Sequence, residues 1–170
     1  MQHVMVLVAD VPGVLRRITG LYGSRGYQVR NVSVGPTGGE GTLRINLALD
    51  EPPERAERFA RQLERLVDVI AVDVVDERGA VGRELALVKV AAAPGRRAEL
   101  IQVAEIFRAR VVDAAPQSIV FEITGDGGKI DAFLEVLREF GILEIARTGT
   151  VALRRGAGVL PAADLDQATG

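Results

Sequence analysis

The chain has 170 residues, enough for one large domain or two small ones, and its 48% hydrophobic share is ample for a buried core. Its 21 basic and 23 acidic residues give a formal net charge of −2, which provides no electrostatic reason to expect a nucleic acid or an anionic membrane as partner. The absence of cysteine excludes disulfides, thiolate metal sites and cysteine nucleophiles.

The first predicted strand is the apolar run over residues 4–9, and a helix follows in which Val14, Leu15, Ile18, Leu21 and Tyr22 recur at helical spacing. The turn between the strand and the helix reads Asp-Val-Pro-Gly-Val-Leu, residues 10–15. Its proline suits the first helical turn, and its glycine lets the main chain approach a ligand closely.

This turn has the chemistry of a free amino acid site. We expect the N–H groups of Gly13 and Val14 to be unpaired, so that they attract a carboxylate, while the Asp10 side chain holds an ammonium group. The alternative is that Asp10 only caps the helix, which is a common role for aspartate at that place.

The rest of the first half completes a βαββαβ unit. Gly26 ends the helix, and a strand over residues 27–34 leads through a glycine-rich turn to a return strand over 42–49. That return strand alternates apolar and polar side chains, which predicts a sheet covered on one face with its second face open. A helix beginning at the Pro52–Pro53 pair and a strand over 67–75 close a ferredoxin-like sandwich, residues 1–76.

The same order of elements recurs after the charged, glycine-bearing residues 76–82, where we place a domain boundary. The predicted elements are a strand over 85–91, a helix carrying Leu100, Val103, Ala104 and Phe107, strands over 110–114 and 118–124, a helix carrying Ile130, Phe133, Leu134 and Leu137, and a last strand over 143–153. We therefore expect an α+β fold of two ferredoxin-like sandwiches, the second over residues 83–154. Residues 155–170 lack apolar periodicity and are predicted to be a disordered tail.

Catalytic side chains are scarce in this sequence. His3 is the only histidine and lies in the first strand, which excludes histidine triads and two-histidine metal sites. The run Gly125-Asp-Gly-Gly-Lys129 is followed by Ile130, where a phosphate loop needs Ser or Thr. We therefore expect a protein that is not an enzyme and binds no metal or cofactor itself, although an unfamiliar chemistry stays open.

The turn and the residues after it carry a resemblance to a known family. The run from Asp10 to Ile18, with Gly20-Leu and Arg25-Gly-Tyr27, resembles an ACT domain, the small-molecule-sensing module of amino-acid metabolism. Further motifs, in an order and spacing that extend from about Gln2 to Gly156, resemble the small regulatory subunit of acetolactate synthase. These are Val34-Gly-Pro-Thr37, Leu66-Val-Asp-Val69, Arg83-Glu84, Leu87-Val-Lys89, Glu105-Ile-Phe-Arg108, Asp113, Lys129-Ile-Asp-Ala-Phe133 and Ala146-Arg-Thr-Gly149.

The resemblance implies a non-catalytic, cytoplasmic regulatory subunit in branched-chain amino acid biosynthesis. Such a subunit activates a separate catalytic subunit, which carries thiamine diphosphate, Mg²⁺ and FAD, and confers feedback inhibition by valine. It forms a homodimer through its ACT domain. No apolar run reaches the length of about 18 residues that a membrane span needs, and the N-terminus lacks a signal-type segment, which fits that location.

The resemblance also implies which residues bind the effector. Valine lies at a dimer interface, between the turn of one chain and the second strand of the other. The corresponding residues here are Asp10, Val11, Pro12, Gly13, Val14 and Leu15 in the turn, with Gln28 and Val29 in the strand. Asp10 and Gln28 stand where relatives usually carry asparagine, so effector affinity and preference are open.

Communication with the catalytic subunit is expected to involve the second domain. The residues that the resemblance suggests are Glu105, Phe107, Arg108 and Arg147, and the alternative for each is an ordinary packing role.

Two other classes of protein compete with this interpretation. A stand-alone two-domain ACT regulator of another enzyme or of transcription would share the first turn but not the motifs of the second domain. An RNA-binding ferredoxin-like domain would need basic strands with exposed aromatic side chains, whereas residues 42–49 contain one arginine and no aromatic residue.

Overall fold

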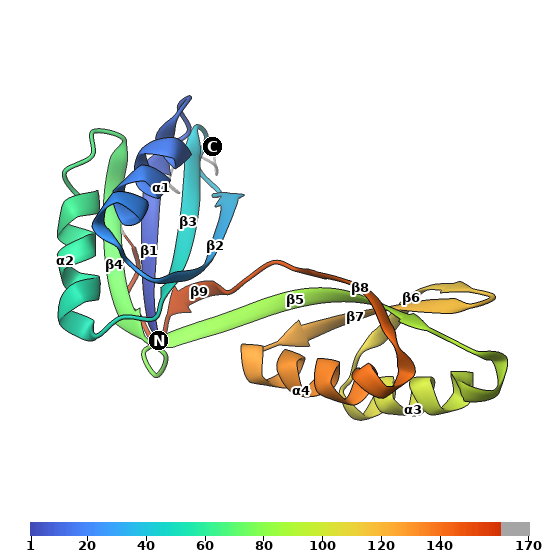
Figure 1. Ribbon diagram of the computed structural model, residues 1–170. Coiled ribbons are helices and arrows are strands. Elements are labelled where there is room, and N and C mark those ends of the chain that lie inside the picture. The colour runs from blue at the N-terminus through green and yellow to red at the C-terminus, as the bar shows by residue number, and fades with distance from the viewer. Residues whose placement is uncertain (161–170) are drawn as a thin grey trace. The chain divides into compact units, whose positions relative to one another are not determined.

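The computed structural model describes residues 1–160, which form two compact units (Figure 1). The first unit comprises residues 1–82 together with the segment that begins at Thr150, and the second comprises residues 83–149. In chain order the elements are β1 (Gln2–Ala9), α1 (Val14–Arg25), β2 (Val29–Pro36), β3 (Thr42–Leu49), α2 (Pro53–Leu63), β4 (Val69–Asp76), β5 (Ala80–Ala91), η1 (Pro94–Arg96), α3 (Arg97–Ile106), β6 (Arg110–Ala115), β7 (Ser118–Gly125), α4 (Gly127–Leu137), η2 (Arg138–Phe140), β8 (Ile142–Arg147) and β9 (Val151–Arg154).

The first unit is built on an antiparallel sheet with the strand order β2-β3-β1-β4. Helices α1 and α2 lie on one face of this sheet (Figure 1). The second unit repeats the plan, with the order β6-β7-β5-β8 and the helices α3 and α4. The predicted α+β fold of two βαββαβ sandwiches is therefore confirmed.

The helix-facing side of the first sheet forms the main core of its unit. The valines at alternate positions of β1 are fully buried against α1 and α2, as are Ile45, Leu47 and Leu49 of β3. Phe59 and Tyr27 are the buried aromatic members, and their ring centroids lie 4.7 Å apart. Burying each such side chain stabilises the folded state by about 1.5–3 kcal/mol. Because the core depends on these residues, the apolar patterns of strand and helix in the sequence identified it.

The second face of the first sheet is not open, so that prediction is wrong. Met5 on this face is fully buried in a small cluster with Val75, Ala80 and Ala152. The cover is the segment from Thr150, whose strand β9 pairs with β5, and the Ala152 N–H donates to the Asn46 side-chain oxygen at 3.3 Å. The apolar alternation of β3 identified only one buried face, because the residues of β3 on the other face are mostly polar and form no apolar stripe.

The second unit has its own core, in which Phe121 and Phe133 meet edge to face at a centroid distance of 6.0 Å. The single strand predicted over residues 143–153 is instead two strands, β8 and β9, that belong to different units. Gly149, with φ of 73°, ends the second unit five residues earlier than the predicted boundary at residue 154. Of the predicted tail, residues 155–160 are described, and 161–170 lie outside the described residues.

Candidate functional site

The turn after β1 is organised by a glycine rather than by the proline before it. Helix α1 begins at Val14, and Gly13 is its N-cap residue with φ of 85° and ψ of 0°. The sequence had predicted Pro12 in the first turn of the helix. In the structure Pro12 precedes the helix. The positive φ of Gly13 reverses the chain sharply and exposes the start of the helix.

The pattern of donors at the helix start differs in part from the prediction. The Val14 N–H is not free, because it donates to the Val11 carbonyl at 3.2 Å. Within residues 1–160, the N–H groups of Gly13 and Leu15 have no hydrogen-bond acceptor. The turn thus retains two donors that can bind a carboxylate, with Leu15 replacing Val14 as the second.

Asp10 does not cap α1. No side chain caps this helix, and the Asp10 carboxylate makes no hydrogen bond or ion pair with any residue from 1 to 160. Asp126 shows the contrast, because its Oδ1 accepts the N–H of Lys129 at 2.8 Å at the start of α4. The exposed Asp10 carboxylate is consequently available to a cation.

Two residues that the sequence did not suggest hold the predicted site in place. The Gly41 carbonyl accepts the Asp10 N–H at 2.8 Å, and Glu51 Oε1 accepts the Gln28 N–H at 2.9 Å. Gly41 has φ of 70°, so the glycine-rich turn between β2 and β3 was a signal that could have indicated the first contact. Glu51 offered no comparable signal.

The two halves of the predicted effector site do not meet within one chain. In β3, Leu49 pairs with both Gln2 and Val29, whereas Thr42 at the other end pairs with Ala9. Asp10 and Val29 therefore lie at opposite ends of the sheet, about 20–25 Å apart for a strand of this length. A complete site from these residues requires a second copy of the chain.

The predicted communication residues divide into two pairs. Phe107 packs into the core of the second unit, with its ring centroid 5.2 Å from that of Phe133, and Arg147 is held by ion pairs. Both therefore have structural roles. Glu105 and Arg108 are exposed at the end of α3, and Arg108 has a φ of 55°, unusual for a residue with a side chain.

Arg147 joins β8 to β5 and to α4. Its Nη2 lies 2.7 Å from Glu84 Oε2, and its Nη1 lies 2.7 Å from Asp131 Oδ1. Burial lowers the pKa of the Arg147 guanidinium, but its hydrogen bonds to the two carboxylates raise it, so that the pKa is above its ordinary value. Because Glu84 is only 9% exposed, this carboxylate needs the guanidinium as a partner.

We expect Arg147→Ala to destabilise the second unit by about 1–2 kcal/mol, less than a fully buried pair because the arginine side chain is 31% exposed. Arg138→Ala is the matched control, since its pair with Glu135 is 72% and 67% exposed and contributes little. Urea unfolding of both variants at neutral pH measures the difference. Equal stabilities would show that the Arg147 ion pairs are not structural.

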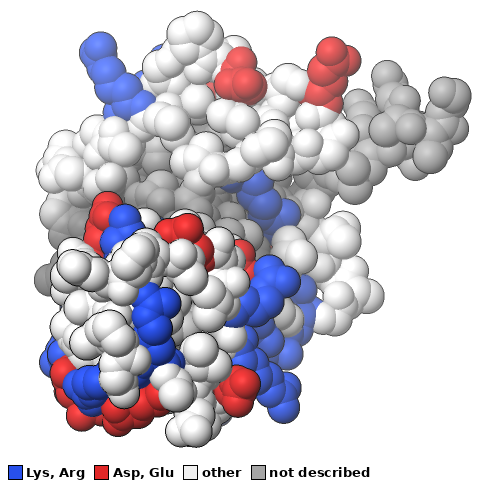
Figure 2. All heavy atoms as spheres, turned by 90° about the vertical axis from the view of Figure 1, so that its right-hand side faces the viewer, with Lys and Arg blue, Asp and Glu red and all other residues white. Residues whose placement is uncertain are grey.

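The surface charges over the described residues do not gather into a patch of one sign in the view of Figure 2. Blue and red side chains lie intermingled over the face shown in Figure 2, in keeping with the formal net charge of −2. Within residues 1–160, no group of three histidine, aspartate or glutamate side chains is arranged to hold a metal ion. In the same residues, no helix is both long and apolar enough to cross a membrane.

Comparison with known proteins gives matches over both units. Residues 4–71 match a family model described as the AHAS small subunit-like ACT domain, and residues 83–156 match one described as the small subunit of acetolactate synthase.

Individual relatives align over nearly the full chain. The probable acetolactate synthase small subunit of Methanothermobacter thermautotrophicus is 43% identical, over 91% of this chain and 92% of its own length. The acetolactate synthase small subunit of Bacillus subtilis is 42% identical, over 92% of each chain. The crystal structure of the acetolactate synthase small subunit from Thermotoga maritima superposes with a TM-score of 0.86 at 33% identity, covering 93% of this chain and 99% of its own.

Proposed function

Because this chain belongs to the family of acetolactate synthase small subunits, we propose that it activates a catalytic acetolactate synthase subunit and makes that enzyme sensitive to valine. The observation that carries this proposal is that family similarity extends over both units, since a stand-alone ACT regulator would share only the first. The chain itself is non-catalytic, and the catalytic subunit supplies thiamine diphosphate, Mg²⁺ and FAD. Both subunits work in the cytoplasm, in branched-chain amino acid biosynthesis.

The proposed homodimer forms through β2. This strand is an edge of the first sheet, so one row of its N–H and C=O groups faces away from β3. Such an edge is a template for pairing with another strand. Two copies related by a two-fold axis can pair their β2 strands antiparallel and continue the sheet across the dimer.

This pairing would complete the effector site. In an antiparallel β2 pair, the start of one strand lies beside the end of the other. Pro36 at the end of β2 pairs with Leu43, at the same end of the sheet as Ala9 and the turn that follows it. The start of the second copy's β2, with its Gln28 and Val29, is thereby brought to the end of the sheet that carries Asp10.

The turn has groups that complement each part of valine. The N–H groups of Gly13 and Leu15 would bind the carboxylate at the positive end of α1, and the Asp10 carboxylate would accept the ammonium group. The Leu15 side chain is 42% exposed and offers an apolar contact for the isopropyl group. Gln28 on the second copy closes the site.

Inhibition would follow from thermodynamic linkage. If valine binds one arrangement of the regulatory dimer better, it shifts the holoenzyme toward that arrangement by no more than its differential affinity. Couplings of this kind are about 1–3 kcal/mol, or roughly 5–150-fold.

The experiment that tests the proposal measures acetolactate formation by the cognate catalytic subunit, alone and with this chain, across a valine titration. We expect the chain to raise the rate and valine to reverse the increase. No change in rate together with no response to valine would contradict the proposal, and copurification would then identify the partner that the chain does regulate.

Arg108 provides a test of the second unit's proposed contact with the catalytic subunit. Its left-handed backbone costs about 1 kcal/mol for a residue with a side chain, a cost that Arg108→Gly removes. If the exposed side chain contacts the catalytic subunit, we expect this variant to fold at least as stably as the parent and to activate the enzyme less. Unchanged activation, measured with the variant at saturation, would remove Arg108 from the proposed interface.

A further inference from the structure

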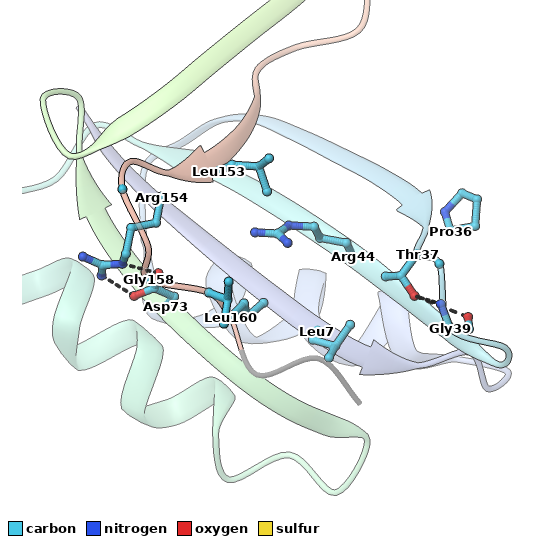
Figure 3. A pocket seen from close by; sticks show the side chains of 13 residues that line it. Leu7, Pro36, Thr37, Gly39, Arg44, Asp73, Leu153, Arg154, Gly158 and Leu160 are labelled. Carbon is cyan, nitrogen blue, oxygen red and sulfur yellow. Dashed lines mark hydrogen bonds and ion pairs between the residues drawn. The ribbon is translucent and has the colours of Figure 1, made fainter. Parts of the chain in front are cut away.

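A cavity of about 520 Å³ lies on the second face of the first sheet, beneath the chain segment that follows Thr150. The sheet contributes Leu7, Arg44 and Asp73, and the segment contributes Leu153, Arg154 and Leu160 (Figure 3). The glycine-rich turn after Pro36 forms one end. Volumes between about 300 and 1,000 Å³ are typical of sites for small molecules.

The most informative group in this cavity is the Arg44 guanidinium, which points into it in Figure 3. The Arg44 Nε is buried without a hydrogen-bond acceptor, and one terminal nitrogen contacts only the Met5 sulfur at 3.4 Å. Within residues 1–160, no carboxylate lies within ion-pair distance of it. A guanidinium has five N–H donors and stays protonated, so an anion is the natural partner for this group.

The nearest negative charge in the cavity is already neutralised. Asp73 forms a two-point ion pair with Arg154, in which Arg154 Nε lies 2.8 Å from Asp73 Oδ2 and Nη2 lies 2.5 Å from Oδ1. Burial lowers the pKa of the Arg44 guanidinium, and the charge of Asp73 offsets this effect only in part. Arg44 and Arg154 are positively charged and Asp73 is negatively charged, so these groups leave one uncompensated positive charge in the cavity wall.

The remaining wall is mostly apolar. Leu7 and Pro36 contribute from the sheet, and Leu153, Val159 and Leu160 contribute from the segment that covers it. The hydroxyl group of Thr37 is occupied within the turn, where it accepts the N–H of Gly39 at 3.2 Å and contacts the hydroxyl of Thr42. The cavity therefore presents one cationic anchor beside an aliphatic surface.

We propose that this cavity binds a small aliphatic monocarboxylate, with its carboxylate on Arg44 and its hydrocarbon body against the leucines of the wall. One unpaired guanidinium matches one negative charge rather than a phosphate with two. The Asp73 carboxylate is engaged by Arg154, so no carboxylate of the described lining is free to pair with an ammonium group, and the lining favours a monocarboxylate over a free amino acid. The site is thus separate from the proposed valine site in both position and ligand chemistry.

The test uses the full chain and 4-methylpentanoate as the probe, with binding measured by isothermal titration calorimetry. We expect saturable binding of one molecule per chain, unaffected by saturating valine. Arg44→Gln should weaken the binding by about tenfold or more, because a charge-assisted hydrogen bond is lost. Arg110→Gln is the matched control, since its ion pair with Glu122 lies in the second unit, and it should bind as the parent does.

Three outcomes would overturn the proposal. The first is no binding by the parent chain, and the second is equal binding by the parent and Arg44→Gln. The third is a probe preference that contradicts the assignment: equal affinity for 4-methylpentanol would remove the role of the charge, and equal affinity for inorganic phosphate would remove the role of the apolar wall. None of these results depends on activation of the catalytic subunit, so this proposal can fail while the regulatory function stands.

Discussion

Replacing Asp10 by alanine should abolish valine inhibition of the holoenzyme while leaving activation by this chain intact. The Asp10 carboxylate is exposed and makes no hydrogen bond or ion pair with residues 1–160. It stands at the start of the turn whose Gly13 and Leu15 N–H groups are free. Its removal deletes the acceptor for the effector's ammonium group without disturbing the fold. The measurement is acetolactate formation against valine concentration, where we expect the rate with the variant to stay at its activated level throughout the titration.

Two further variants separate ligand binding from helix capping. Asp126→Ala removes an aspartate that does cap a helix, so it should cost about 1 kcal/mol of stability and leave the valine response unchanged. Asp10→Asn keeps a side-chain oxygen acceptor and should retain measurable inhibition. Valine inhibition that persists unchanged in Asp10→Ala would contradict the assignment of this turn to the effector.

Apolar periodicity predicted most of the fold because the two helix-facing cores follow it closely. Ala56, Phe59, Ala60 and Leu63 recur at helical spacing, and all four are buried in α2. The predicted bounds of β3 coincide with those observed, since a strand that alternates so regularly has only one favourable register. Local patterns of this kind carry most of the information about which elements form.

The second face of the first sheet could not be predicted because its cover comes from a distant part of the chain. Ala152 and Asn46 are 106 positions apart, and neither belongs to an apolar stripe. Arg44 occupies a polar position of the alternating strand β3, and this pattern predicts a residue that faces solvent. Only the return of the chain at Thr150 places that arginine in the wall of a cavity.

The turn that we propose as the effector site was predictable in type but not in every detail. Its sequence indicates a strand-to-helix turn with free donors, which is what the structure contains. Which donors are free depends on the backbone: the Val14 N–H donates to the Val11 carbonyl across a turn centred on Pro12 and Gly13, where Gly13 has a positive φ. A Pro-Gly pair favours such a turn, so this pair was the signal that could have indicated the bond. The separation of Asp10 from Val29 likewise requires the strand register.

Introducing a carboxylate at Ala152 should have the largest effect on stability. Ala152 is 1% exposed in the cluster with Met5, Val75 and Ala80, so Ala152→Asp must either bury a charge or release the segment from the sheet. We expect a loss of about 3 kcal/mol in the free energy of unfolding of the first unit at pH 7. Ala157→Asp places the same side chain at an exposed position of this segment and should change stability by less than about 0.5 kcal/mol.

The dependence on pH distinguishes a buried charge from a steric effect. Burial raises the pKa of the introduced carboxylate above its value in the unfolded chain. As the pH falls, the folded chain therefore takes up a proton before the unfolded chain does, and the cost of burying the charge decreases. The deficit of Ala152→Asp should therefore shrink between pH 7 and pH 5 in urea unfolding, whereas a deficit that is constant with pH would indicate a steric cause. Because Leu153 and Arg154 follow directly and line the cavity, release of the segment should also abolish binding of 4-methylpentanoate.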